Sequence, residues 1–105
     1  MGDDINAALV YHYKALEIRL KLLGNHADTA LSSYCLGNTE SAVNNHAGAL
    51  QSHQRALDIR MKLLGDHTDT VTAYLAVIAD LGKLGDTGRM KELKLKCDEM
   101  QRPFS

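Results

Sequence analysis

Two stretches of the chain decide its fold, because they have nearly the same sequence. Residues 15–29 read ALEIRLKLLGNHADT and residues 56–70 read ALDIRMKLLGDHTDT, at an offset of 41 residues. Eleven of the fifteen positions are identical. A fixed period of this length is typical of stacked-repeat proteins. Such stacks usually work as binding surfaces, so the repeat bears on function as well as on fold.

Helical periodicity extends both copies of the phrase toward the N-terminus. Apolar residues at intervals of three and four predict one helix over residues 5–23 and another over 47–64. The first stripe is Ile5, Ala8, Leu9, His12, Ala15, Leu16, Leu20 and Leu23, and the second is Ala49, Leu50, His53, Ala56, Leu57, Met61 and Leu64. The members of the second stripe lie 41 residues after members of the first, so the two helices share one register.

Glycine and aspartate mark where these helices end and the next ones begin. Gly24 and Gly65 directly follow the two stripes and predict helix ends, because glycine readily takes the left-handed conformation. Asp28 and Asp69 are then predicted N-caps of two shorter helices, which run to about residue 43 and to residue 84. Both shorter helices are rich in small residues, so each is expected to lie as an inner helix between longer outer ones.

Two turns and a tail complete the predicted organisation. Residues 44–46 are poor helix formers and predict a tight turn, and residues 85–88, which read GDTG, predict another. A last helix is expected over 89–101, and residues 102–105, which include the only proline, are expected to fray. Because no alternating run suggests a strand, the sequence predicts one all-α domain of about five helices.

Composition argues against several classes of function. The net charge is −1 with both signs interspersed, whereas binding to nucleic acid requires a basic face. No apolar run reaches the roughly 18 residues of a membrane span, and no signal peptide opens the chain. We therefore expect a cytoplasmic protein without a nucleic-acid or membrane partner.

The cysteines and histidines do not form a metal or catalytic site. Cys35 and Cys97 are far apart and lack a C-x-x-C partner, so we expect two reduced, buried thiols. His26 and His67 occupy equivalent linker positions, which indicates linker geometry rather than metal binding. No arrangement of nucleophile, base and acid stands out, and no glycine-rich loop follows a strand. The sequence predicts no metal, no cofactor and no enzymatic activity.

Residues 28–60 resemble the tetratricopeptide repeat. Leu36 and Gly37 stand where the family has its Leu-Gly pair, and Ala49 and Ala56 stand at the small positions of the following helix. The long period and the linker L-G-x-H-x-D resemble the variety of about 42 residues found in kinesin light chains and nephrocystin-3-like proteins. The resemblance covers nearly the whole chain and implies an α-solenoid of antiparallel helix hairpins. It divides the chain into a half repeat (5–23), a full repeat (28–64) and a divergent repeat (69–101), two and a half in all.

The resemblance implies a peptide-binding concave face lined by the inner helices. Kinesin light chains clamp a peptide backbone with a pair of asparagines, but Tyr34-Cys35 and Leu75-Ala76 stand at those positions here, so this chemistry is not carried over. The candidate binding residues are Tyr34, Cys35, Asn38, Ser41, Leu75, Ala76, Ala79 and Lys83. Tyr34 is the best single anchor, because tyrosine combines a large contact area with a polar tip. Other departures from the family pattern are Glu40, His46 and Ile78.

Two interpretations of function stay open at this point. The first is a protein-interaction module that binds a peptide or helix of unknown identity on its concave face. The apolar candidates could instead pack against a neighbouring helix or chain. The second is a self-assembling unit, because Tyr11, Ile18 and Leu22 form an extra apolar line on the first helix. Either the chain is an excerpt of a longer array, or this line pairs with a second copy and forms a homo-oligomer.

Overall fold

The chain folds into helices throughout the part that the structure describes. This computed structural model describes residues 2–23, 27–65 and 67–101, of which 2–6 and 19–23 are described as backbone only. The helices are α1 (Gly2–Leu23), α2 (Ala27–Ala42), α3 (His46–Leu64), α4 (Thr68–Leu84) and α5 (Thr87–Gln101). The described residues contain no strand. The predicted all-α stack of about five helices is confirmed.

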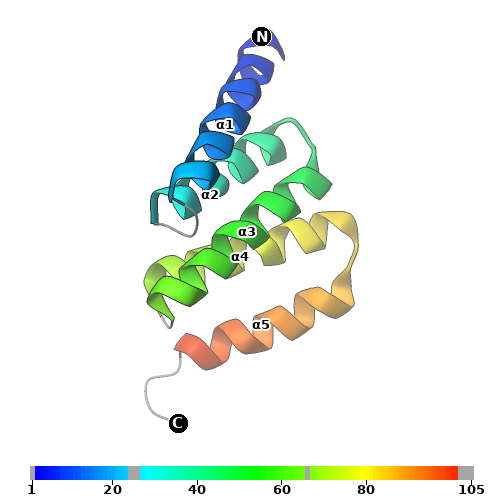
Figure 1. Cartoon of the computed structure of the whole chain (residues 1–105). Helices are drawn as coiled ribbons and strands as arrows, with labels where there is room; N and C mark the ends of the chain where they lie inside the picture. The colour runs from blue at the N-terminus through cyan, green and yellow to red at the C-terminus, as the bar shows by residue number, and fades with distance from the viewer. Residues whose placement is uncertain (1, 24–26, 66, 102–105) are drawn as a thin grey trace.

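Each helix packs against the helix that follows it in the chain. Figure 1 shows the resulting zigzag, in which α2 and α4 pass behind α1 and α3. The body measures 47 × 33 × 17 Å. Its shortest dimension fits two layers of helices, whose axes pack about 8–10 Å apart. The helices α2 and α4 therefore form an inner layer, as their small residues predicted. The expectation that every outer helix is longer was wrong for α5, which has 15 residues against 16 in α2 and 17 in α4.

Every helix begins slightly earlier than the sequence predicted. Asp28 and Asp69 lie in the first turns of α2 and α4, so their prediction as N-caps was wrong. The cap of α4 is His67, whose extended backbone lets its Nδ1 accept a hydrogen bond from the Asp69 amide at 3.1 Å. Asp69 instead places a negative charge near the positive end of the helix dipole. The equivalent His26 lies outside the described residues, as do Gly24 and the predicted tail at 102–105.

The other predicted turns lie where expected but are shorter, because α3 already begins at His46 and α5 at Thr87, and the predicted helix end at Gly65 is confirmed. Asn44 takes a left-handed backbone with φ 64°, and the side chain of Asn45 accepts a hydrogen bond from the Gly48 amide at 3.1 Å to cap α3. Gly65 and Gly85 follow α3 and α4 with φ values of 61° and 81°. These positive angles suit glycine and end the two helices.

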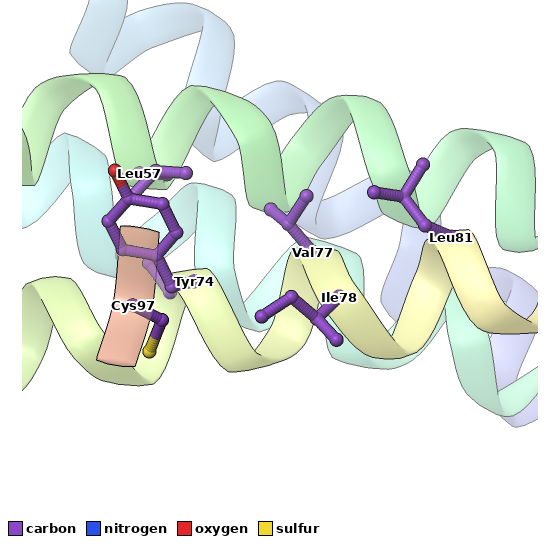
Figure 2. Close-up of a cluster of buried hydrophobic side chains, with 7 residues drawn as sticks. Leu57, Tyr74, Val77, Ile78, Leu81 and Cys97 are labelled. Carbon is purple, nitrogen blue, oxygen red and sulfur yellow. The ribbon is translucent and has the colours of Figure 1, made fainter. Parts of the chain in front are cut away.

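The main hydrophobic core surrounds α4. Figure 2 shows Tyr74, Val77, Ile78 and Leu81 of α4 together with Leu57 of α3 and Cys97 of α5. Burial raises the pKa of the Cys97 thiol, and the nearby Asp98 carboxylate raises it further. Because α4 buries side chains toward both α3 and α5, it is an inner helix in packing as well as in position.

The predicted stripes of the outer helices are buried only in part. Met61 and Leu64 of α3 are 39% and 44% exposed, so their assignment to the core was wrong, whereas Ile59 is buried. Leu64 borders a shallow hollow beside the first turns of α2. The residues of α2 that line this hollow include Ala27, Asp28 and Ala30, whose short side chains leave Leu64 partly exposed. In α1, Leu16 is the one described side chain that is fully buried.

None of the helices, over the residues that the structure describes, is long and apolar enough to cross a membrane.

Inner and outer helices approach most closely at Gly37. A Cβ atom on Gly37 of α2 would overlap the imidazole ring of His53, which projects from α3. His53 is itself buried, so the ring has little room to move away. The glycine of the Leu-Gly pair therefore serves close packing between α2 and α3.

We predict that Gly37→Ala lowers the free energy of unfolding by about 1–3 kcal/mol, because the added methyl group overpacks this contact. Gly88→Ala is the matched control, since a Cβ atom at Gly88 of α5 meets nothing within 4 Å. Alanine at a helical glycine of this kind is expected to be neutral or to stabilise by about 0.5–1 kcal/mol. Urea unfolding followed by circular dichroism measures both. Equal stabilities of the two variants would contradict the close contact.

Candidate functional site

A hollow of about 440 Å³ opens between α2, α3 and α4. We call it the inner hollow, because the two inner helices supply most of its walls. Its lining residues are Tyr34, Asn38 and Ser41 from α2, His53 from α3, and Thr72, Leu75, Ala76, Ala79 and Asp80 from α4. Two pairs of lining residues, Tyr34 with Leu75 and Asn38 with Ala79, are 41 residues apart, so α2 and α4 contribute equivalent positions to the hollow.

The structure brings most of the candidate binding residues together in this hollow. Tyr34, Asn38, Ser41, Leu75, Ala76 and Ala79 all line it. Two candidates do not. Cys35 is half-buried, and its carbonyl oxygen accepts a hydrogen bond from the Thr39 hydroxyl at 3.1 Å. Lys83 is exposed one turn further along α4.

The floor of the hollow is a buried polar network that the sequence analysis missed. His53 and Asp80 are each only 3% exposed. His53 Nδ1 lies 2.5 Å from Asp80 Oδ2, and His53 Nε2 lies 3.0 Å from Asn38 Oδ1. Asp80 Oδ2 is the partner of Nδ1 and Asn38 Oδ1 is the partner of Nε2, so both ring nitrogens are hydrogen-bonded. The imidazole therefore links α2, α3 and α4 and leaves the buried carboxylate paired.

One sequence signal could have pointed to this network. Asp80 follows the apolar run that ends with Ile78 and Ala79, and its neighbour Leu81 is buried. An acid in such a helix needs a buried partner. His53, in the stripe of the preceding outer helix, was the available candidate.

Tyr34 stands at the rim of the hollow and is held from two sides. Its ring centroid lies 5.4 Å from that of His53, with the planes tilted by 50°. The guanidinium carbon of Arg60 lies 4.9 Å from the Tyr34 centroid, within the range of a cation–π contact. Arg60 is held in turn by a 3.0 Å hydrogen bond to the Asp69 carbonyl oxygen. These contacts fix the orientation of the tyrosine before any ligand arrives.

The walls of the hollow combine apolar and polar groups. Leu75 is 54% exposed, and Ala76 and Ala79 continue its apolar surface along α4. Asn38 and Ser41 on the opposite wall offer hydrogen-bonding groups. Pockets that bind ligands are commonly lined in this way, with apolar area and a few polar groups that fix orientation.

The histidine and aspartate do not form a catalytic pair with a nucleophile. Both nitrogens of the His53 ring are taken, by Asp80 and by Asn38, so neither can activate a hydroxyl or a thiol. The described residues also hold no group of three or more histidine, cysteine or acidic side chains that could bind a metal ion.

A second hollow, of about 330 Å³, lies between α1, α2 and α3. Glu40 lies buried at its base and accepts hydrogen bonds from the hydroxyls of Tyr13 at 2.7 Å and Ser52 at 2.5 Å. The bond to Glu40 raises the pKa of Tyr13, with smaller contributions from burial and from the charge of Glu40. Two donors thus satisfy a carboxylate that stands where an aromatic residue was expected.

We predict that Asp80→Asn lowers the free energy of unfolding by about 1–3 kcal/mol, because the buried imidazole loses its charged acceptor. Asp58→Asn is the control, since Asp58 is exposed and accepts a surface hydrogen bond from the Gln54 amide. A surface change of that kind is expected to stay within about 0.5 kcal/mol. Chemical denaturation distinguishes the two, and an Asp80 variant as stable as the Asp58 variant would contradict the role of the network.

Comparison with known families agrees with the geometry. The sequence profile of the family described as "Tetratricopeptide repeat" matches residues 2–62, which is more than half of the chain and spans α1, α2 and nearly all of α3. None of the curated proteins matches the chain. Tetratricopeptide repeats generally mediate interactions between proteins and are non-catalytic scaffolds. The specific variety of about 42 residues stays a prediction. The match over half of the chain and the observed helix stack together mean that the chain belongs to the tetratricopeptide repeat family.

Proposed function

We propose that the inner hollow binds an extended or helical peptide segment of another protein. The observation that carries this proposal is the exposed Leu75 beside an oriented Tyr34, above a floor that is fixed by buried hydrogen bonds. A volume of about 440 Å³ accommodates one or two side chains of a ligand rather than a whole folded surface. The peptide would place an apolar side chain in the hollow.

The chemistry of the two walls suggests how the peptide is oriented. An apolar side chain would pack on Leu75, Ala76 and the ring of Tyr34. The amide of Asn38 and the hydroxyl of Ser41 would bond to polar groups of the peptide backbone. Because the floor and rim are already ordered, binding would lose little conformational entropy in the receptor.

The repeat organisation is part of the same proposal. We propose that α1 is a half repeat, that α2 and α3 form a full repeat, and that α4 and α5 form a divergent one. The family match ends at residue 62, before α4, which supports the divergent assignment. We retain a cytoplasmic location as a proposal because Cys35 and Cys97 are both free thiols.

A selection from a random dodecapeptide library with the purified chain tests the proposal, followed by calorimetric titration of the selected peptides. Tyr34→Ala and Leu75→Ala should each weaken binding at least about tenfold, or about 1.4 kcal/mol, because both remove apolar contact in the hollow. Lys83→Ala and Leu95→Ala are the controls, since neither residue lines the hollow and both are exposed. Selected peptides that are insensitive to both hollow variants would show that the binding site lies elsewhere.

A further inference from the structure

The shared register allows α1 to be compared with α3 residue by residue. On α3, the line Ala49, Ser52, Ala56 and Ile59 is buried, with exposed fractions between 0% and 8%. Ser52 bonds to Glu40 of α2, so this line faces the inner helix that precedes α3. On α5 the equivalent line, Met90, Leu93, Cys97 and Met100, belongs to or packs against the core around α4.

The same line on α1 is only partly covered in the described structure: Ala8 and Ala15 are half-buried, and its two large side chains are exposed. Its members, 41 residues before those of α3, are Ala8, Tyr11, Ala15 and Ile18, which we call the open face. Tyr11 is 73% exposed and Ile18 is 57% exposed, although the equivalent Ser52 and Ile59 are buried. Large apolar side chains at a position that is buried in the next outer helix indicate an interface that is missing its second side.

The order of small and large residues on the open face suggests what covers it. Small and large side chains alternate along it at spacings of three and four. In an antiparallel pair of α1 helices, Ala8 would lie opposite Ile18 of the second copy, and Tyr11 opposite Ala15 of the second copy. Each contact would join a small residue to a large one, as interdigitated helix packing requires. A parallel pair would set alanine against alanine and tyrosine against tyrosine.

The other end of the stack does not fit the open face. On α5, the positions equivalent to Leu50, His53 and Leu57 of α3 carry charged, exposed side chains: Lys91, Lys94 and Asp98. A head-to-tail contact between α5 and the open face would take two lysines and an aspartate out of water and set them against apolar side chains, which is costly. A two-fold arrangement instead uses the same surface of both copies.

We propose that two copies of this chain form a dimer through their α1 helices, packed antiparallel on the open face. The interface continues the packing line that the hairpins α2–α3 and α4–α5 use within the chain. It does not involve any residue of the inner hollow, which lies between α2, α3 and α4. The dimer would therefore present two inner hollows and bind a partner with two peptide segments more tightly than one with a single segment.

Sedimentation velocity of the full chain over a concentration series tests the dimer. The natural chain should shift from monomer to dimer as its concentration rises. Ile18→Glu should weaken the dimer at least about 100-fold, because a two-fold interface receives every substitution twice. Leu95→Glu is the control, since Leu95 is 67% exposed on α5 and outside the open face. Circular dichroism shows whether both variants retain the helical fold.

Disulfide cross-linking tests the antiparallel arrangement. A mixture of Tyr11→Cys and Ala15→Cys chains should form a disulfide between positions 11 and 15, identified by mass spectrometry of the linked peptides. If disulfides between two Tyr11→Cys chains form in preference to disulfides between positions 11 and 15, the helices pack parallel and the proposed geometry is overturned.

Three other outcomes would overturn the dimer itself. A natural chain that stays monomeric at every concentration would show that a second copy does not cover the open face. A monomer that binds a synthetic peptide of residues 68–84 in an Ile18-dependent manner would assign the open face to an inner helix. A dimer weakened equally by Leu95→Glu would lie on another surface.

Discussion

The imidazole of His53 is the point on which the positions of three helices depend. The side chain projects from α3, passes over the bare backbone of Gly37 on α2 and pairs with Asp80 on α4. A larger residue at Gly37 would displace the ring, and loss of Asp80 would leave a buried ring nitrogen without its acceptor. The same ring forms the floor of the inner hollow and contacts Tyr34 at its rim. The packing of the stack and the shape of the proposed site therefore rest on one buried side chain.

The two outer helices at the ends of the described stack differ in chemistry although they share a register. α1 exposes Tyr11 and Ile18 at positions that are buried in α3, whereas α5 presents the charges of Lys91 and Lys94 to solvent. The α1 end of the stack is thus suited to an apolar contact, and the α5 end is suited to solvent. The proposed peptide binding in the inner hollow and the proposed pairing through α1 use different helices, so the two proposals are compatible in one molecule.

Sequence reasoning succeeded where the signal is local and failed where it depends on tertiary contact. The repeated phrase predicted the helices and the glycine end of α3 at Gly65, because periodicity and left-handed glycine act over a few residues. Placing candidate site residues on the inner helices also brought most of them into one hollow. The rotation of α2 left Cys35 outside it, and Lys83 lies one turn beyond it along α4. The pairing of His53 with Asp80 joins residues 27 positions apart and appears only when α3 and α4 pack. His67 was missed as a cap because histidine is not among the preferred N-cap residues.

The central role of His53 is tested most directly by a double-mutant cycle between Gly37→Ala and Asp80→Asn, measured by urea unfolding. The two residues lie on different helices, and both act on the same ring. If Gly37→Ala already displaces the imidazole, the His53–Asp80 hydrogen bond is weakened before Asp80 is changed. Asp80→Asn then costs less stability in the Gly37→Ala background. The double variant should therefore be at least about 1 kcal/mol more stable than the sum of the two single effects implies. Effects that add within about 0.5 kcal/mol would show that His53 does not couple α2 to α4, and would contradict this account.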